Sequence, residues 1–154
     1  MSENIGIREY CENDLNFVIS SWLKSYETSY FASRRVSKDD DKRKACIQAP
    51  IFRREHRNLI IRCLTDCVAY IACSLDDPDL IFGYIVADKD CVHFIYVKKG
   101  FRQHHIATAL LQKTAMPDKY EYSHFLPNFG YMLNKSKTAY YNPYRFFRYG
   151  SDKN

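Results

Sequence analysis

The sequence predicts a single α/β domain, residues 1–154, in which a mixed, mainly antiparallel sheet is flanked by helices. The length fits one domain with a substantial buried core. Hydrophobic residues make up 46% of the chain and charged residues 27%, as in ordinary globular proteins. Two amphipathic helical segments come early, and three short apolar runs separated by turns follow them. Together these patterns predict helices packed on one sheet.

The first elements expected are a short strand and two helices. Residues 5–7 alternate between apolar and polar, and Asn13 or Asp14 can cap the helix that follows. The first helix is predicted by apolar residues at three- and four-residue spacing: Leu15, Val18, Ile19, Trp22, Leu23 and Tyr26. The polar stretch 33–44 is expected to form a loop or a helix end. A second apolar stripe over 56–67 predicts the second helix.

The middle of the chain is expected to form a meander of three strands. The strand-like runs are 68–73, 80–87 and 91–97. Acidic turn residues separate them at 76–79 and at 88–90. Because the connections are so short, neighbouring strands should pair antiparallel.

The last third is expected to add one helix, one strand, and then a second helix and strand. Apolar spacing starts a helix at Ile106, and Pro117 must end it. Residues 120–126 are strand-like. We expect a short helix over 134–141, followed by a final strand over 144–149.

Basic residues concentrate in two parts of the chain, 34–62 and 98–154, and the net charge is +5. Such blocks favour an anionic ligand, and a cofactor that carries phosphates suffices. For the first block, 34–62, a solvated basic surface is the preferred interpretation. Nucleic-acid binding is an alternative that would use this block. Its residues would be Arg34, Arg35, Lys42–Lys44 and Arg53–Arg57, with Tyr30 and Phe31 nearby.

No apolar run approaches the roughly 20 residues that cross a bilayer, and residues 1–8 do not resemble a signal peptide. We therefore expect a cytoplasmic protein that does not bind a membrane, with its six cysteines reduced. Cys63 and Cys67 have helical i,i+4 spacing, whereas zinc ligands usually lie closer together. We expect no metal site. A cysteine nucleophile with a histidine partner is an alternative, but the sequence positions no such pair.

The most informative stretch is 97–107, where an apolar strand runs into a basic loop and then into the start of a helix. The N-terminus of a helix presents unpaired N–H groups and the positive end of the helix dipole, and it can bind a phosphate. Lys98, Lys99 and Arg102 add positive charge beside it. The arrangement predicts a binding site for a pyrophosphate.

This stretch resembles the acetyl-CoA signature of the Gcn5-related N-acetyltransferase (GNAT) superfamily, Arg/Gln-x-x-Gly-x-Gly/Ala after a strand that ends in valine. The matching residues are Val97, Phe101, Arg102, Ile106 and Ala107. The resemblance covers nearly the whole chain and implies the GNAT acyl-CoA N-acyltransferase fold. Asn134, Ala139 and Tyr141 resemble the second motif, in which a helix carries a tyrosine. The runs 96–98 and 141–144 are similar to short acetyltransferase-like proteins encoded by tailed bacteriophages.

The resemblance implies an acyltransferase that uses acetyl-CoA and transfers the acetyl group directly to an amine. The acceptor would then be a small molecule, a protein amino group or a modified base. The implied pantetheine contacts are the backbone groups of Ile95, Tyr96 and Val97. The implied pyrophosphate contacts are Arg102 and the backbone of Gln103, His104, His105, Ile106 and Ala107. Tyr141 is the expected general acid, and His124, or else His93, is the expected base.

One residue departs from the motif, because His105 stands where the family has its first glycine. We expect the turn not to need the conformational freedom of glycine, so that the fold survives. The imidazole then points away, contacts a phosphate or blocks the site. In the last case the chain is an inactive GNAT-fold module that binds a partner. Arg102→Ala and Ala107→Glu are expected to abolish CoA binding without unfolding the chain. Separately, an exposed late strand could pair with a second copy of the chain and form a homodimer.

Overall fold

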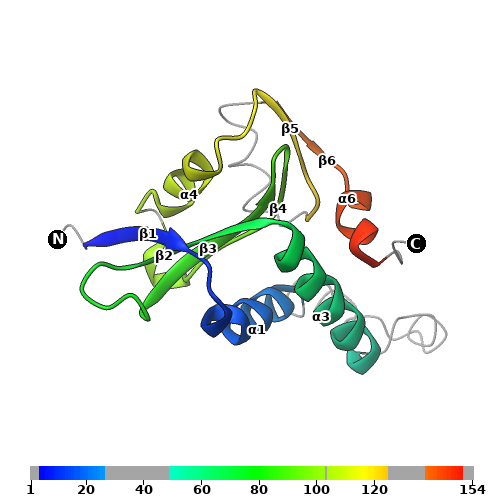
Figure 1. Ribbon diagram of the computed structural model, residues 1–154, viewed down its shortest axis with the longest axis horizontal. Coiled ribbons are helices and arrows are strands. Elements are labelled where there is room, and N and C mark those ends of the chain that lie inside the picture. The colour runs from blue at the N-terminus through cyan, green and yellow to red at the C-terminus, as the bar shows by residue number, and fades with distance from the viewer. Residues whose placement is uncertain (1–3, 27–48, 103, 125–137, 151–154) are drawn as a thin grey trace, which may run out of the picture.

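The computed structural model describes residues 4–26, 49–102, 104–124 and 138–150, which form one six-stranded sheet with helices on both faces (Figure 1). The strands are β1 (Ile5–Glu9), β2 (Val68–Ser74), β3 (Ile81–Asp88), β4 (Cys91–Val97), β5 (Lys119–Tyr122) and β6 (Thr138–Tyr141). The α-helices are α1 (Leu15–Tyr26), α3 (Ala49–Asp66), α4 (Ile106–Thr114) and α6 (Tyr144–Phe147). Short 3-10 turns are η1 (Glu12–Asp14), η3 (Lys99–Phe101) and η4 (Arg148–Gly150). Among the described residues, no helix combines the length and the hydrophobicity needed to cross a membrane.

The sheet has the strand order β1-β2-β3-β4-β5-β6. The first four strands pair antiparallel, and β5 and β6 each pair parallel to the strand before them. This confirms the mixed, mainly antiparallel sheet and the meander predicted from the short acidic turns. The β4–β5 pair is parallel because α4 lies between the two strands along the chain and returns it to the same end of the sheet.

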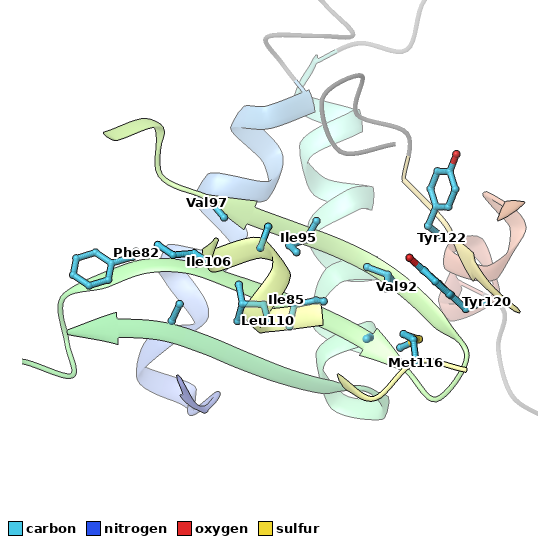
Figure 2. Close-up of a cluster of buried hydrophobic side chains, with 13 residues drawn as sticks. Phe82, Ile85, Val92, Ile95, Val97, Ile106, Leu110, Met116, Tyr120 and Tyr122 are labelled. Atoms are coloured by element: carbon cyan, nitrogen blue, oxygen red, sulfur yellow. The ribbon is translucent and has the colours of Figure 1, made fainter. Parts of the chain in front are cut away.

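Helix α4 covers one face of the sheet, and α1 and α3 cover the other (Figure 1). Figure 2 shows the core under α4. It is built from Ala72, Phe82, Ile85, Ala87, Val92, Ile95, Val97, Ile106, Ala107, Leu110, Met116, Tyr120 and Tyr122. On the other face Trp22 of α1 stacks on Phe94 of β4, with ring centroids 4.6 Å apart, and Ile60 of α3 and Phe146 of α6 join them. Alternate residues of β3 and β4 therefore supply two separate cores.

The C-terminal part differs from the sequence-based expectation. Residues 138–141 form strand β6 rather than the end of a helix, and 144–150 form α6 and η4 rather than a strand. Pro143 is the N-cap of α6 at φ −65°, a value that favours a helix start over a strand. The Arg145 side chain then bonds Glu121 on β5 and Asp90 in the turn before β4. Positions 33–44, 125–126 and 134–137 lie outside the described residues.

The end of α4 carries an unusual backbone conformation at Ala115, which has φ 51° and ψ 47°. An L-residue in this left-handed region costs roughly 1–2 kcal/mol, whereas glycine adopts it freely. Glycine loses more conformational entropy on folding than alanine, which offsets part of this gain. Ala115→Gly should therefore raise the free energy of unfolding by about 0.5–1 kcal/mol. Thermal unfolding checks this. Ala109→Gly, in the middle of the same helix, is the control and should lower stability by about 1 kcal/mol. A loss of stability in both variants would contradict the account.

Candidate functional site

Strands β4 and β5 share a short ladder and then part. They pair at Val92 and Tyr122, and a last bond joins Ser123 N to Val92 O at 3.1 Å. Beyond this point β4 runs on to Val97, and within the described ranges no strand pairs with its outer edge. In Figure 2, Tyr122 lies near the Val92 end of β4, whereas Val97 lies farther along, beside Ile106 of α4. In the described part of the chain, the outer edge of β4 therefore has no strand partner beyond Val92, and we call this stretch the open edge.

The open edge of β4 carries backbone groups that are able to bind an extended ligand. Lys98 N donates to Phe82 O on β3 at 2.8 Å. Backbone groups alternate in direction along a strand, so those of Tyr96 also face β3. Those of Ile95 and Val97 face the opposite side, which is the open edge. The arrangement suits an amide-rich chain such as pantetheine, because such a chain pairs with a strand edge as another strand does.

The N-terminus of α4 follows the open edge directly. The first helical bond of α4 runs from Ala109 N to His105 O at 3.0 Å. The N–H groups of Ile106–Thr108 therefore lie in the first turn, where a helix offers them no acceptor. The exposed side chains of Lys99 and Arg102 lie in the loop before the helix. The predicted combination of strand, basic loop and helix start is present, and it fits a pyrophosphate.

Arg102 also contacts the strand that precedes it. Its Nε donates to Val97 O at 3.1 Å, so the guanidinium lies at the end of the open edge of β4. The charge of Arg102 is thereby placed between the strand edge and the start of α4. This position supports the role that the sequence predicted for it, as a contact for a ligand that runs from one to the other.

His105 adopts the left-handed conformation, with φ 58° and ψ 19°. The expectation that this position does not need the freedom of glycine is therefore wrong. The chain turns sharply from the loop into α4, and this turn requires a positive φ. Histidine tolerates the left-handed region better than most L-residues but still pays a strain that glycine avoids. The side chain is exposed beside the first turn of α4.

Replacing His105 by glycine should relieve this strain and clear the space next to the helix start. We expect His105→Gly to raise the free energy of unfolding by about 0.5–1 kcal/mol. The dissociation constant of CoA should fall on the order of tenfold, about 1.4 kcal/mol. Thermal unfolding and calorimetric titration measure the two effects. His104→Gly is the matched control, because His104 is exposed with a negative φ, and it should improve neither quantity. Weaker CoA binding by His105→Gly would show that the imidazole contacts the ligand.

The side chains of the next two predicted residues, Ile106 and Ala107, do not face the site. Both are buried in the core under α4, so only their backbone N–H groups are available to a ligand. The expectation that Ala107→Glu abolishes CoA binding without unfolding is wrong, because the new carboxylate would be buried in an apolar core. His104 is exposed, and Gln103 lies outside the described residues.

His124 follows β5 at the point where β4 and β5 part, and its side chain is buried. Ser123 Oγ joins two histidines: it lies 2.8 Å from His93 Nδ1 and 2.9 Å from His124 Nδ1. Burial, followed by the nearby His56 and His93, lowers the pKa of His124 well below its ordinary value. The imidazole is therefore neutral at neutral pH. The sequence suggested both histidines but not Ser123, since only the β4–β5 pairing brings this side chain between them.

Tyr141 ends strand β6 and pairs with Tyr122, which pairs with Val92 of β4. The three residues form one row across the sheet, at the level where β4 and β5 part. The Tyr141 side chain is 50% exposed, and its ring centroid lies 5.6 Å from that of Tyr122. Burial, and then Tyr122, raise the pKa of the Tyr141 phenol. The motif helix expected around this tyrosine is a strand at 138–141.

A second cluster was not foreseen from the sequence. Cys63 and Cys67 of the α3 segment lie beside His93 of β4, and one ligand atom from each lies within 4.8 Å of the other two. The i,i+4 spacing of the cysteines was visible in the sequence. Their histidine partner was not, because it comes from a strand about 30 residues later in the chain. The alternative of a cysteine nucleophile with a histidine partner had no such pair in the sequence. The structure places Cys63 and Cys67 beside His93.

The chain matches the family model described as "Acetyltransferase (GNAT) family" over residues 19–120. No curated protein matches it. Among solved structures it is similar to apo-form YjaB from Escherichia coli, with 14% identity, coverage of 71% of this chain and 63% of that one, and a TM-score of 0.46. A GNAT-family acetyltransferase from Staphylococcus aureus MU50 has 21% identity, with coverage of 71% of this chain and 62% of that one, and a TM-score of 0.42. The PaiA N-acetyltransferase of Thermoplasma acidophilum, solved with coenzyme A, has 21% identity, with coverage of 75% of this chain and 70% of that one, and a TM-score of 0.44. The chain thus spans less than two thirds of the first two proteins.

Proposed function

Since this chain belongs to the acetyltransferase (GNAT) family, we propose that it transfers the acetyl group of acetyl-CoA to an amine. Acetyl-CoA is the acetyl donor of this family. One observation carries the proposal for this chain: β4 and β5 part beside the N-terminus of α4. The open edge of β4 leads directly to the start of α4. A ligand with an amide-rich arm followed by a pyrophosphate requires this order of binding groups.

The chain's own groups would hold this ligand along its length. The outward backbone groups of Ile95 and the N–H of Val97 would pair with the pantetheine amides, since they lie on the open edge of β4, whereas Val97 O already accepts from Arg102 Nε. The first-turn N–H groups of α4 would bind the pyrophosphate, and Arg102 and Lys99 would balance its charge. Tyr96 would contribute mainly by packing, because its backbone groups face β3.

Acetyl-CoA supplies an activated acyl group and a thiolate leaving group. The protein must then remove a proton from the acceptor amine and give one to the departing sulfur. We assign the first role to His124, whose neutral imidazole would accept the proton, while Ser123 Oγ, 2.9 Å from its Nδ1, would hold the ring in place. Burial lowers the pKa of this ring, so its protonated form would be short-lived. We assign the second role to Tyr141, whose raised pKa keeps the phenol protonated at neutral pH.

A second candidate function rests on His105. Its left-handed backbone and exposed side chain lie beside the first turn of α4. If the imidazole blocks the pyrophosphate, the chain keeps the GNAT fold as a module that binds a partner. The nucleic-acid alternative receives no such support, because most of its basic block lies outside the described residues. A cytoplasmic location, and kinship with short phage-encoded proteins, stay part of the proposal.

An acceptor survey tests the proposed activity. The purified protein is incubated with acetyl-CoA and one amine class at a time: polyamines, amino sugars, lysine peptides, peptides with a free N-terminus, and modified nucleobases. Release of free CoA thiol is followed with a thiol-reactive dye. We expect at least one class to raise the rate above that of acetyl-CoA alone. If acetyl-CoA binds but no amine class raises the rate of CoA release, the proposed activity is wrong and the partner-binding module takes its place.

A further inference from the structure

The cluster of Cys63, Cys67 and His93 has the dimensions of a metal site. Cys63 Sγ and Cys67 Sγ lie 3.7 Å apart. Two sulfur ligands at about 2.3 Å from a tetrahedral zinc ion are separated by about 3.8 Å. His93 Nε2 is the ring nitrogen on the side of Tyr149, which also contacts Cys67. The ligand atoms of all three residues are mutually within 4.8 Å.

A fourth polar atom lies at the same place. The hydroxyl of Tyr149 on η4 is 2.9 Å from Cys67 Sγ and 3.3 Å from His93 Nε2. Nitrogen and oxygen ligands of a tetrahedral zinc ion, each at about 2.0 Å, are also separated by about 3.3 Å. A sulfur and an oxygen ligand would be about 3.5 Å apart, so Tyr149 would have to move away from Cys67 by about 0.6 Å to be the fourth ligand. A water molecule in its place would need no such shift.

The surroundings of His93 orient it for this role. Its Nδ1 lies 2.8 Å from Ser123 Oγ on the opposite side of the ring, which directs Nε2 toward the cysteines. Metal-binding histidines usually have such a partner on the second nitrogen, because it fixes the ring and the tautomer. His93 is also the additional residue at the bulge of β4, where the register shifts between Val86 and Ala87 of β3. The bulge turns His93 toward the same face as Phe94, where α3 lies.

Charge and burial favour a divalent ion. Cys63 is 0% exposed and His93 is 1% exposed. Burial disfavours isolated charge, but two thiolates and one dication sum to zero. Thiolate and imidazole ligands in tetrahedral geometry select zinc over calcium or magnesium.

We propose that Cys63, Cys67 and His93 bind one zinc ion, with Tyr149 or water as the fourth ligand. The ion would join α3, β4 and the C-terminal η4, next to the point where β4 and β5 part. Thiols held only by hydrogen bonds, and a Cys63–Cys67 disulfide, are the two competing states. The proposal does not depend on the acetyltransferase activity.

A direct metal titration tests the proposal on the whole chain. The reduced, metal-free protein is titrated with Co²⁺, and the thiolate-to-cobalt charge-transfer absorption and the d–d bands of tetrahedral cobalt are recorded. We expect saturation at one equivalent, loss of the absorption on adding Zn²⁺, and a thermal unfolding midpoint that rises with zinc and falls with a chelator. Absence of binding to the folded, reduced protein at micromolar metal would overturn the proposal. So would a Cys63–Cys67 disulfide in metal-free protein isolated from cells.

Variants assign the ligands. Cys67→Ser and His93→Gln should each weaken Co²⁺ binding at least tenfold and alter its spectrum. Cys73→Ser is the matched control, because Cys73 is a buried free thiol on β2 outside the cluster. It should retain the wild-type stoichiometry and spectrum. Equal losses in Cys73→Ser and Cys67→Ser would overturn the assignment, and if a variant does not fold, the wild-type titration still decides.

Discussion

Replacing Tyr141 by phenylalanine is expected to lower the turnover of acetyl transfer about a hundredfold, the usual contribution of a general acid. The phenol is half-exposed at the row where β4 and β5 part, and its raised pKa keeps it protonated at neutral pH. Removal of the hydroxyl leaves the ring contact with Tyr122 in place. The dissociation constant of acetyl-CoA should therefore change little. Steady-state kinetics with a surveyed acceptor and calorimetric titration measure the two quantities.

The pH profile adds a second readout for Tyr141. An acid that must be protonated loses activity as the pH rises through its pKa, which lies above the ordinary value of about 10. The Tyr141→Phe variant should lack this alkaline limb. Tyr140→Phe is the matched control, since Tyr140 is a neighbouring exposed tyrosine on the opposite face of β6. Equal turnover in wild type and Tyr141→Phe would remove Tyr141 from the acid role.

Thr108→Glu is expected to raise the dissociation constant of CoA on the order of tenfold to a hundredfold without unfolding the protein. Thr108 is exposed in the first turn of α4, unlike the buried Ala107 before it. A carboxylate there repels a pyrophosphate a few ångströms away, at a cost of several kcal/mol before screening. The same carboxylate interacts favourably with the helix dipole, so the stability should stay level or rise by about 0.3–1 kcal/mol.

The control for this variant is Thr108→Gln, which has the same shape without the charge. It should bind CoA nearly as the wild type does. The difference between the two variants should shrink at high salt, because exposed charges are screened. If both variants bind CoA equally well, the phosphates do not lie at the start of α4.

The N-terminal two thirds of the fold could be predicted because its signals are local. Apolar spacing predicted the two early helices, although the second begins at Ala49, seven residues before the predicted stripe over 56–67. The turns at 76–79 and 88–90 predicted the antiparallel meander. The C-terminal part could not be predicted in the same way. Tyrosines fit a strand or a helix equally, and the state of 138–141 depends on pairing with β5. Pro143 marks a boundary in the sequence, but a helix follows it in the structure, whereas the sequence predicts a strand there.

The candidate site divides along the same lines. The strand, basic loop and helix start at 97–107 are contiguous in the sequence, so they could be found without a structure. The left-handed backbone of His105 could not, because it depends on the angle at which the loop enters α4. Ser123 and the cluster around His93 were also missed, since strand pairing and helix packing bring together residues distant in the chain.

A calorimetric titration of the purified protein with acetyl-CoA and with CoA tests the central claim most directly. The open edge of β4 and the start of α4 predict saturable binding of both ligands with one site per chain. A parallel thermal scan should show a matching rise in stability, about 2.7 kcal/mol at a hundredfold excess over the dissociation constant. Absence of heat and of any thermal shift at millimolar ligand, with the protein folded, would contradict the account. His105→Gly would then show whether the imidazole alone prevents binding: restored binding would identify His105 as the block, and continued absence would mean that this member of the family does not use acetyl-CoA.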